Sequence, residues 1–297
     1  MVGIVVGLGE ALFDLLPAGP VLGGAPLNVA VHAHQLGAEG ILVSRVGRDE
    51  FGDRIRKELA SRSMSADHLQ TDPDRPTGTV QVTLRNGEPQ YDIVPDVAWD
   101  AIDFTPDLEA LASRCAAVCF GSLAQRGSRS SAAIIRFLDR AGRAVRLFDV
   151  NLRQRYYSRG VLTAGLERST MVKLNETELP RVLQTLGLAA VGEVDDRMET
   201  LRRAFGLGVA VLTRGAQGTV LYTSEGRIEG SPVSYPARPN ADNVGAGDAC
   251  SAGLLVGMIR GWPPQRTVDL ANHLGAYVAS VPGATPLLPA PLLARAR

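Results

Sequence analysis

Lysine is almost missing from this chain of 297 residues, in which only Lys57 and Lys173 occur among 31 basic residues. Arginine therefore carries nearly all of the positive charge, and 31 acidic residues balance it. Because the net charge is zero, nucleic acid and acidic membrane surfaces are not expected as the main partners.

Cysteine is also scarce, since the chain has only Cys115, Cys119 and Cys250. Three cysteines in a mostly apolar setting are typical of reduced thiols in a cytosolic protein rather than of a disulfide framework. Cys115 and Cys119 lack a second pair of ligands at usable spacing, while His32 and His34 stand alone. A zinc site is therefore not expected.

No apolar run reaches the length of about 20 residues that a membrane span requires. The N-terminal run Ile4-Val5-Val6 has no basic leader and is too short for a signal peptide. We therefore expect a soluble protein that resides in the cytoplasm.

Two familiar nucleotide-binding signatures are missing as well. The sequence contains no Gly-x-x-x-x-Gly-Lys-Ser/Thr motif, which excludes a P-loop kinase. Gly7-Leu8-Gly9 begins like a dinucleotide fingerprint, but Leu12 stands where the third glycine is needed. A dinucleotide-dependent oxidoreductase is therefore disfavoured.

Short apolar strands and helical stretches alternate along most of the chain. Strands are expected at residues 2–8, 41–46, 118–120, 145–148, 171–173 and 209–212, and helices at 25–36, 53–60, 130–140, 195–205 and 249–259. This alternation predicts an α/β fold, in which helices cover both faces of a mostly parallel sheet. With no repeats and no low-complexity linker, residues 1–297 are expected to form one domain.

Two segments break this alternation. Residues 79–84 and 90–94 have period-two patterning on either side of Asn86-Gly87, a pair that favours a hairpin turn. Residues 11–16 are a further extended segment. Together they predict a small antiparallel β lid, inserted from about residues 11–20 and 77–97, that covers a site. The exposed edge of such a lid could pair with a second copy, giving a homodimer.

The most informative stretch is Gly245-Ala246-Gly247-Asp248, which joins a polar loop to an apolar helix. Glycines let the backbone approach a ligand closely, and the free N–H groups of a helix start favour an anion. Asp248 lies in the same turn and can accept a proton from whatever attacks that anion. The pattern suggests phosphoryl transfer, although a helix cap with a dipole-stabilising Asp is the structural alternative.

Candidate sugar contacts lie near the N-terminus. Gly23 and Gly24 open a helix in which Asn28 projects an amide that can bond hydroxyl groups, although a tight loop would look similar. Asp14 follows the first strand, and ligands of open α/β sheets gather at that edge. It could accept two sugar hydroxyls or be an ordinary solvated acid.

Residues at the ends of later strands complete the set. Asn175 and Glu178 could hold Mg²⁺ through waters or form a capping box, and both roles are compatible. Arg153 could meet a phosphate or a substrate oxygen, or else form an ion pair. In residues 213–218, a hydroxyl and exposed amides could meet phosphates or ribose, or form a plain turn.

Taken together, these motifs resemble the ribokinase-like (PfkB) carbohydrate kinases. The two signatures of that family are matched by Gly23-Gly24-Ala25-Pro26-x-Asn28-x-Ala30, with Gly37 and Gly47 at the family spacing, and by Asp242-x-x-Gly245-Ala246-Gly247-Asp248. Val46-Gly47-x-Asp49-x-Phe51-Gly52, Asn175-x-x-Glu178 and Thr213-x-Gly215 also fit, so the resemblance runs almost end to end. Gly9-Glu10-Ala11-Leu12 through Asp14, with Asp149-x-Asn151-x-Arg153, looks most like the bacterial fructokinase branch.

The resemblance implies an ATP-dependent kinase that phosphorylates a primary hydroxyl of a small sugar. Fructose is the first candidate, and 2-keto-3-deoxygluconate, ribose and a nucleoside are alternatives. The residues that would bind the sugar are Asp14, Gly23, Gly24, Asn28 and Arg153. Asp248 would be the base, with the lowered pKa expected in the first turn of a helix. The amides of Gly245, Ala246 and Gly247 would stabilise the moving phosphoryl group.

ATP and Mg²⁺ are the implied cofactors. The residues implied in nucleotide binding are Asn175, Thr213, Gly215, Gly218 and Asn272, and those implied in cation binding are Glu178 and Asp242. Asp242 stands beside a loop that in this family often holds a monovalent cation such as K⁺. One departure is Asn243, which occupies a position where the family usually has Thr or another small residue.

Alternatives of other kinds are also open at this point. A non-catalytic sugar or nucleotide sensor on the same scaffold should have a broken Gly-Ala-Gly-Asp motif, and here that motif is whole. A nucleoside kinase should offer an aromatic ring for stacking near the lid, for which Tyr91 and Trp99 are the candidates.

Overall fold

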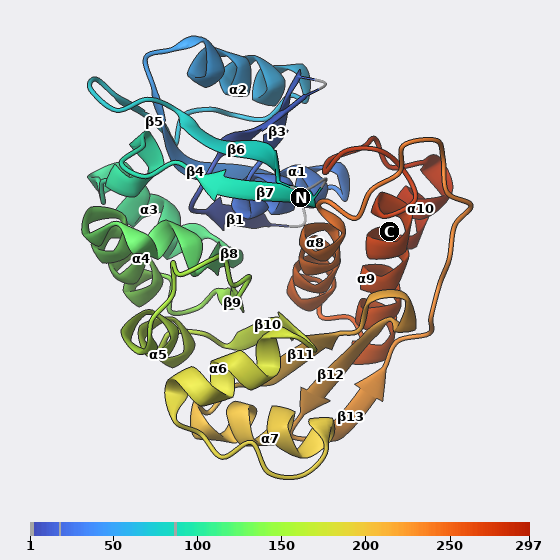
Figure 1. The fold of residues 1–297 in the computed structure, drawn as a ribbon. Coiled ribbons are helices and arrows are strands. Elements are labelled where there is room, and N and C mark those ends of the chain that lie inside the picture. Colours follow the sequence, from blue (N-terminus) through green and yellow to red (C-terminus); the bar gives the residue numbers. More distant parts are fainter. Residues whose placement is uncertain (1–2, 18, 86–87) are drawn as a thin grey trace.

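The computed structural model describes residues 3–17, 19–85 and 88–297, and within them the strands form two sheets (Figure 1). The larger sheet has nine strands. In spatial order they are β13 (Gly226–Glu229), β12 (Thr219–Thr223), β11 (Val209–Thr213), β10 (Met171–Asn175), β9 (Val145–Asp149), β8 (Ala117–Gly121), β1 (Ile4–Leu8), β4 (Glu39–Gly47) and β5 (Leu69–Asp72). The strands from β11 to β5 are parallel, and β12 pairs antiparallel with both of its neighbours.

Helices alternate with these strands, as the sequence predicts. They are α1 (Ala25–Gln35), α2 (Glu50–Ser61), α3 (Pro106–Arg114), α4 (Ser128–Arg140), α5 (Arg159–Glu167), α6 (Glu178–Leu186), α7 (Val194–Ala204), α8 (Ala246–Ile259), α9 (Pro264–Val278) and α10 (Ala290–Arg295). Short 3₁₀ turns lie at η1 (Ala98–Ala101), η2 (Leu123–Arg126) and η3 (Gly215–Gln217). Among the described residues, no helix combines the length and the apolar character needed to cross a bilayer.

Both faces of the large sheet are buried, because successive side chains of each strand point to opposite sides. Val6 of β1 packs in an apolar cluster with residues of α3 to α7, whereas its neighbour Val5 packs with residues of α1, α8 and α9. Phe120 and Phe148 stack within the first cluster, with ring centroids 5.0 Å apart. The predicted α/β fold with helices on both faces is therefore confirmed.

The second sheet is formed by the segments predicted to be a lid, so we call it the lid, and it lies beside α2 in Figure 1. Its strand order is β3 (Gly19–Gly23), β2 (Leu12–Leu16), β6 (Gly78–Arg85) and β7 (Glu88–Ile93). The prediction of an antiparallel lid was wrong for one pair, because β2 and β6 are parallel and the sheet is mixed. Both strands leave the same edge of the large sheet, after β1 and β5, and so they run in the same direction. The Asn86-Gly87 turn lies outside the described residues.

The Gly47-x-Asp49 motif fastens the lid to the large sheet. Asp49 caps α2 by accepting a 2.8 Å hydrogen bond from the Gly52 amide. The same carboxylate accepts from the amide and the hydroxyl of Thr77, each at 2.7 Å, immediately before β6 begins. Burial alone would raise the pKa of Asp49, but the hydrogen bonds from Thr77 and Gly52 together lower it.

Asp49→Ala should therefore reduce the free energy of unfolding by about 1–3 kcal/mol, since it removes a helix cap and leaves the Thr77 donors without their acceptor. Urea denaturation of the variant and the parent chain measures this difference. Thr77→Val keeps the cap on Gly52 but removes the hydroxyl that accepts from the Gly47 amide at 2.9 Å and donates to Asp49, so it measures the Thr77 contacts separately from the cap. An Asp49→Ala variant as stable as the parent would show that the lid is held by other contacts.

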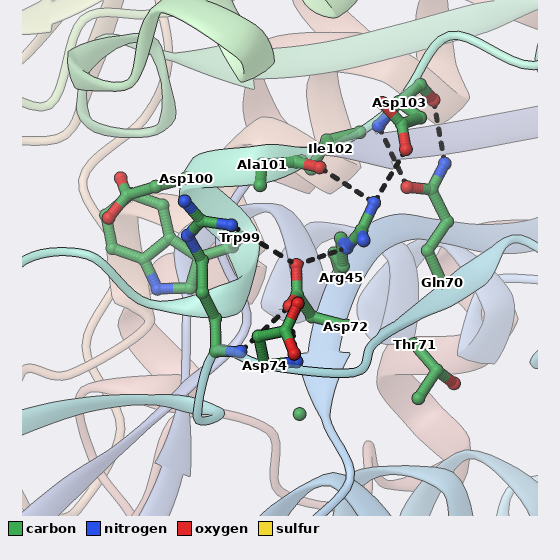
Figure 2. Close-up of polar contacts among 12 residues, drawn as sticks. Arg45, Gln70, Thr71, Asp72, Asp74, Trp99, Asp100, Ala101, Ile102 and Asp103 are labelled. Atoms are coloured by element: carbon green, nitrogen blue, oxygen red, sulfur yellow. Dashed lines mark hydrogen bonds and ion pairs between the residues drawn. The ribbon is translucent and has the colours of Figure 1, made fainter.

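A buried charge network anchors the other side of the lid (Figure 2). Arg45 of β4 pairs with Asp72 at 2.8 Å and Asp103 at 2.7 Å, and donates to the Ala101 carbonyl at 3.0 Å. These contacts hold η1 in place, and with it Trp99, whose side chain is fully buried. An ideal Cβ on Gly78 would lie 2.1 Å from the Trp99 indole nitrogen, so this ring packs beneath the first residue of β6.

Trp99 is therefore a core residue of the lid base and has no free face for stacking on a ligand. The sequence offered it as an aromatic candidate because an isolated Trp beside a lid segment gives no indication of its burial. The other candidate, the Tyr91 side chain, lies outside the described part of the chain.

Candidate active site

The first turn of α8 is built around Gly245. This residue has a φ of +78°, and an ideal Cβ on it would lie 2.5 Å from the Ala284 carbonyl oxygen. Only glycine adopts this conformation readily and leaves room for residue 284. No side chain in the described structure caps the helix, and Gly247 is exposed. The start of α8 therefore presents backbone N–H groups that can receive an anion.

The rest of α8 is buried and consists largely of small residues from Ala249 to Gly257. A helix that is apolar on all sides belongs in a core. Here it packs between the large sheet and α9, where an ideal Cβ on Gly253 would lie 2.9 Å from the Ala271 Cα. This close packing fixes the position of the first turn.

A hydrogen bond joins the two ends of the chain at this point. The Asn28 side-chain amide of α1 donates to Asp248 Oδ2 at 2.7 Å, although the two residues are 220 positions apart. Asn28 is placed by Gly24, which has a φ of +111° and caps α1, and where a Cβ would lie 2.5 Å from the Glu10 carbonyl oxygen. The Asn28 side-chain oxygen is buried and has no partner among the described residues. The N-terminal and C-terminal motifs thus form one site.

The pKa of Asp248 is raised to about 6. Burial is the largest cause, followed by the negative charge of Asp149, while the Asn28 hydrogen bond and the charges of Lys173 and Arg153 lower it. The expectation of a lowered pKa from the helix dipole was therefore wrong, because desolvation and a neighbouring carboxylate outweigh the dipole. At neutral pH Asp248 remains mostly ionised, and it is a stronger base than an ordinary aspartate.

Three acids and one arginine gather on the Asn28 side. Asp14, on β2, is half-buried, and an ideal Cβ on Gly23 would lie 3.1 Å from its carboxylate. Burial raises the pKa of Asp14 and the positive charge of Arg153 lowers it. The same guanidinium also lowers the pKa of Glu10 and Asp248, so it lies within electrostatic range of all three acids. Arg153 is exposed and has no ion pair among the described residues.

Glu10 is a further acid close to Asp248, and the sequence identifies it only as part of the Gly9-Glu10-Ala11-Leu12 motif. It is 3% exposed, and its Oε2 has no partner among the described residues. Its pKa is raised to about 7, first by burial and also by the charge of Asp248, while its backbone contacts and Arg153 lower it. Its place directly after β1, at the edge where ligands gather, was the signal that could have identified it.

A cavity of about 620 Å³ adjoins Ala246 and Gly247, and none of Glu10, Asp14, Asn28 and Asp248 lines it. The residues predicted to bind nucleotide all line it, namely Asn175, Thr213, Gly215, Gly218 and Asn272, together with Ala246 and Gly247. Asn175 and Thr213 are paired neighbours at the ends of β10 and β11. Asn272 donates to the Ser231 carbonyl at 2.9 Å, and its side-chain oxygen is buried without a partner among the described residues. Tyr235 is the aromatic residue of the lining.

The two cation-binding candidates are engaged in backbone contacts. Asn175 Oδ1 accepts from the Glu178 amide at 3.0 Å, and Glu178 Oε2 accepts from the Asn175 amide at 2.9 Å, which is a capping box. The other Glu178 oxygen accepts from the Leu152 amide at 2.8 Å. Asp242 accepts from the amides of Val244 at 2.9 Å and Gly283 at 3.3 Å.

Within the described ranges, no cluster of three or more His, Cys, Asp or Glu could hold a metal ion. The carboxylate oxygens of Glu178 retain lone pairs, however, and Mg²⁺ usually keeps several waters and takes its other ligands from one or two carboxylates and substrate phosphates. Glu178 could therefore help to hold a metal ion that binds together with the nucleotide, through a water molecule between the ion and the carboxylate.

A family model described as pfkB family carbohydrate kinase matches residues 20–291. The chain belongs to this family. The kinase is 32% identical to a fructokinase from Klebsiella pneumoniae over an alignment of 309 positions, which covers 95% of each chain.

Solved structures agree with this assignment. The kinase is similar to a sugar kinase from Pyrococcus horikoshii in complex with ATP, at 27% identity, 95% coverage of each chain and a TM-score of 0.78. It is also similar to a double mutant of the fructokinase from Vibrio cholerae with bound fructose, ADP and potassium ion. That match has 27% identity, a TM-score of 0.76, and coverage of 99% of this chain and 98% of the other. The protein is thus a carbohydrate kinase with a ribokinase-like fold.

Proposed function

We propose that this kinase transfers the γ-phosphoryl group of ATP to a primary hydroxyl of a small sugar, with fructose as the first candidate. The hydrogen bond between Asn28 and Asp248 carries this proposal, because it joins the polar cluster around Asp14 to the first turn of α8. The similarity to fructokinases from Klebsiella pneumoniae and Vibrio cholerae supports fructose as the sugar to test first.

In this proposal the sugar lies on the Asn28 side of α8. Asp14, Asn28 and Arg153 bind its hydroxyl groups, and Gly23 and Gly24 let it approach the backbone. Asp248 accepts the proton of the attacking hydroxyl. Because phosphoryl transfer passes through a loose transition state, that proton can leave late, so a base with a pKa of about 6 is sufficient.

ATP occupies the cavity on the other side, with its phosphates toward Gly247. The amides of Gly245, Ala246 and Gly247 then stabilise charge on the moving phosphoryl group. Asn175, Thr213, Gly215, Gly218 and Asn272 would contact the nucleotide, and Glu178 would help to hold Mg²⁺. Bound Mg²⁺ would offset the negative charge of the phosphates. A K⁺ ion would lie beside Asp242, and Asn243 lines the same cavity.

Asn28→Ala should raise the KM for the sugar by about 10-fold, because it removes the amide that would bond a sugar hydroxyl, while ATP binding is spared. The variant should also move the acid limb of the pH profile upward, because the Asn28 hydrogen bond lowers the pKa of Asp248. Calorimetric titration with each ligand measures the two affinities. An equal loss of sugar and ATP binding would mean that Asn28 only shapes the loop.

The proposed activity is tested by coupled ADP release across a panel of sugars, with and without K⁺. We expect sugar-dependent ADP release, highest with fructose. The panel includes 2-keto-3-deoxygluconate, ribose and a nucleoside, so that a different best substrate would be recognised. Binding of sugar and ATP without ADP release would instead favour the non-catalytic sensor.

A further inference from the structure

One of the two lysines of the chain is buried beneath the first turn of α8. Lys173 of β10 lies 2.8 Å from Asp149 Oδ1 of β9, and both side chains are about 6% exposed. An ideal Cβ on Gly247 would lie 3.6 Å from the Lys173 ammonium nitrogen. The lysine therefore lies directly against a glycine that lines the nucleotide cavity.

The other partner in this ion pair is tied to the same helix. Ser251 Oγ lies 2.9 Å from Asp149 Oδ2 and 3.1 Å from the Gly247 carbonyl oxygen, one helical turn away. Ser251 is fully buried, so its hydroxyl proton is shared between these two acceptors. Lys173, Asp149 and Ser251 thus connect two central strands to the turn that carries Asp248.

The stability of the fold alone does not account for a buried ion pair at this position. Removing two charges from water is costly, and replacement of a buried ion pair by apolar residues is often neutral or stabilising. Elsewhere the chain uses arginine for nearly every positive charge. A compact ammonium at this position provides a single positive charge under the turn that would receive the phosphoryl group.

We propose that Lys173 and Asp149 are positioning residues for phosphoryl transfer: the pair holds the first turn of α8 and supplies positive charge beneath the Gly247 amide. This inference rests on the proposed kinase mechanism and adds two residues to it. Lys173 favours negative charge on the phosphoryl group from below, and Asp149 keeps the ammonium in place. The pair also acts on Asp248, on which its two charges have opposite effects.

The test of this proposal uses the pKa of Asp248, so the charged groups around that carboxylate must be considered. They are Asp149 of β9, Lys173 of β10, Arg153 in the loop after β9, and Glu10 after β1. The thiols of Cys119 on β8 and Cys250 on α8 also lie in range, and burial raises the pKa of both, so they stay neutral. The charge of Asp149 raises the pKa of Asp248, and that of Lys173 lowers it.

The first measurement is the pH profile of kcat/KM for the sugar. Asp149→Asn should move its acid limb to lower pH by about one unit, since it removes the charge that raises the pKa of Asp248. Ser251→Ala is the matched control, because it removes the tether to Asp149 and leaves both charges, so the limb should stay in place. An Asp149→Asn limb that does not move would overturn the electrostatic role.

The second measurement is kcat. Lys173→Met should lower kcat by about 10- to 100-fold, within the range found when a group that stabilises transition-state charge is lost. The double variant Asp149→Asn/Lys173→Met leaves no unpaired buried charge, so it should fold, as circular dichroism would verify, and remain as slow as Lys173→Met. Parent-like kcat in either variant overturns the proposal. An unsubstituted chain that releases no ADP with any sugar would overturn the kinase mechanism too, whereas an active parent with unaffected variants overturns only this inference.

Discussion

Asp248→Asn should lower kcat by about 10²- to 10⁴-fold, the range for loss of a general base. The amide has nearly the same shape and can still accept the hydrogen bond from Asn28, but it cannot take up the hydroxyl proton. Steady-state ADP release measures the loss, and the KM for ATP should change little because Asp248 is not among the residues that line the nucleotide cavity. Near-normal turnover would remove Asp248 from the chemistry.

The same variant should be more stable than the parent above pH 6. A carboxyl whose folded-state pKa rises from 3.8 to about 6 destabilises the fold as pH increases through that interval, because the unfolded chain ionises first. At pH 8 the gain could reach about 3 kcal/mol, at about 1.4 kcal/mol per pKa unit. Urea denaturation at pH 8 and pH 4 should show this gain shrinking toward acid. A variant less stable than the parent at pH 8 would contradict the burial of this carboxyl.

Gly245→Ala is the second substitution with a large expected effect. A methyl group at this position would lie 2.5–2.8 Å from residue 284 on a backbone with a φ of +78°, so the loop before α8 must shift. Displacing the amides of Gly245, Ala246 and Gly247 should lower kcat/KM by about 10²- to 10³-fold, as the loss of an oxyanion-type donor does. Strain and overlap together should lower the free energy of unfolding by about 2–4 kcal/mol.

Gly261→Ala is the matched control for this experiment. Gly261 follows the other end of α8 with a φ of +66°, but nothing lies within 4 Å of its ideal Cβ. It should therefore cost only the left-handed strain of about 1–2 kcal/mol and leave kcat unchanged. If both variants lose the same stability and retain activity, the contact between residues 245 and 284 is unimportant for the site.

The parts of this fold that sequence predicts are those that depend on local pattern. Runs such as Val118-Cys119-Phe120 are apolar on both faces because parallel strands are covered on both sides, and each expected strand is present. Gly245 could be recognised because a helix start with a left-handed conformation requires a glycine, and a glycine is visible in the sequence. The nearness of Asn28 to Asp248 followed only from the family resemblance, since no local pattern links residues 220 positions apart.

The features that could not be predicted from the sequence are those that depend on the three-dimensional surroundings of a residue. The segment 19–23 contains Gly and Pro, which are depleted in strands, yet it pairs with β2 at the edge of the lid. The pKa of Asp248 depends on burial and on Asp149, which come from the packing of α8 against the sheet. Lys173 was overlooked for the same reason, because its burial beneath the first turn of α8 has no signature in the chain.

The pH dependence of kcat/KM for the sugar, at saturating ATP and Mg²⁺ between pH 5 and 9, tests the role of Asp248 most directly. The predicted profile rises with a slope of one to an inflection near pH 6 and is flat above it, and the residual activity of Asp248→Asn lacks that inflection. A parent profile that is flat down to pH 5, or an inflection that persists unchanged in Asp248→Asn, would contradict the assignment of Asp248 as the base.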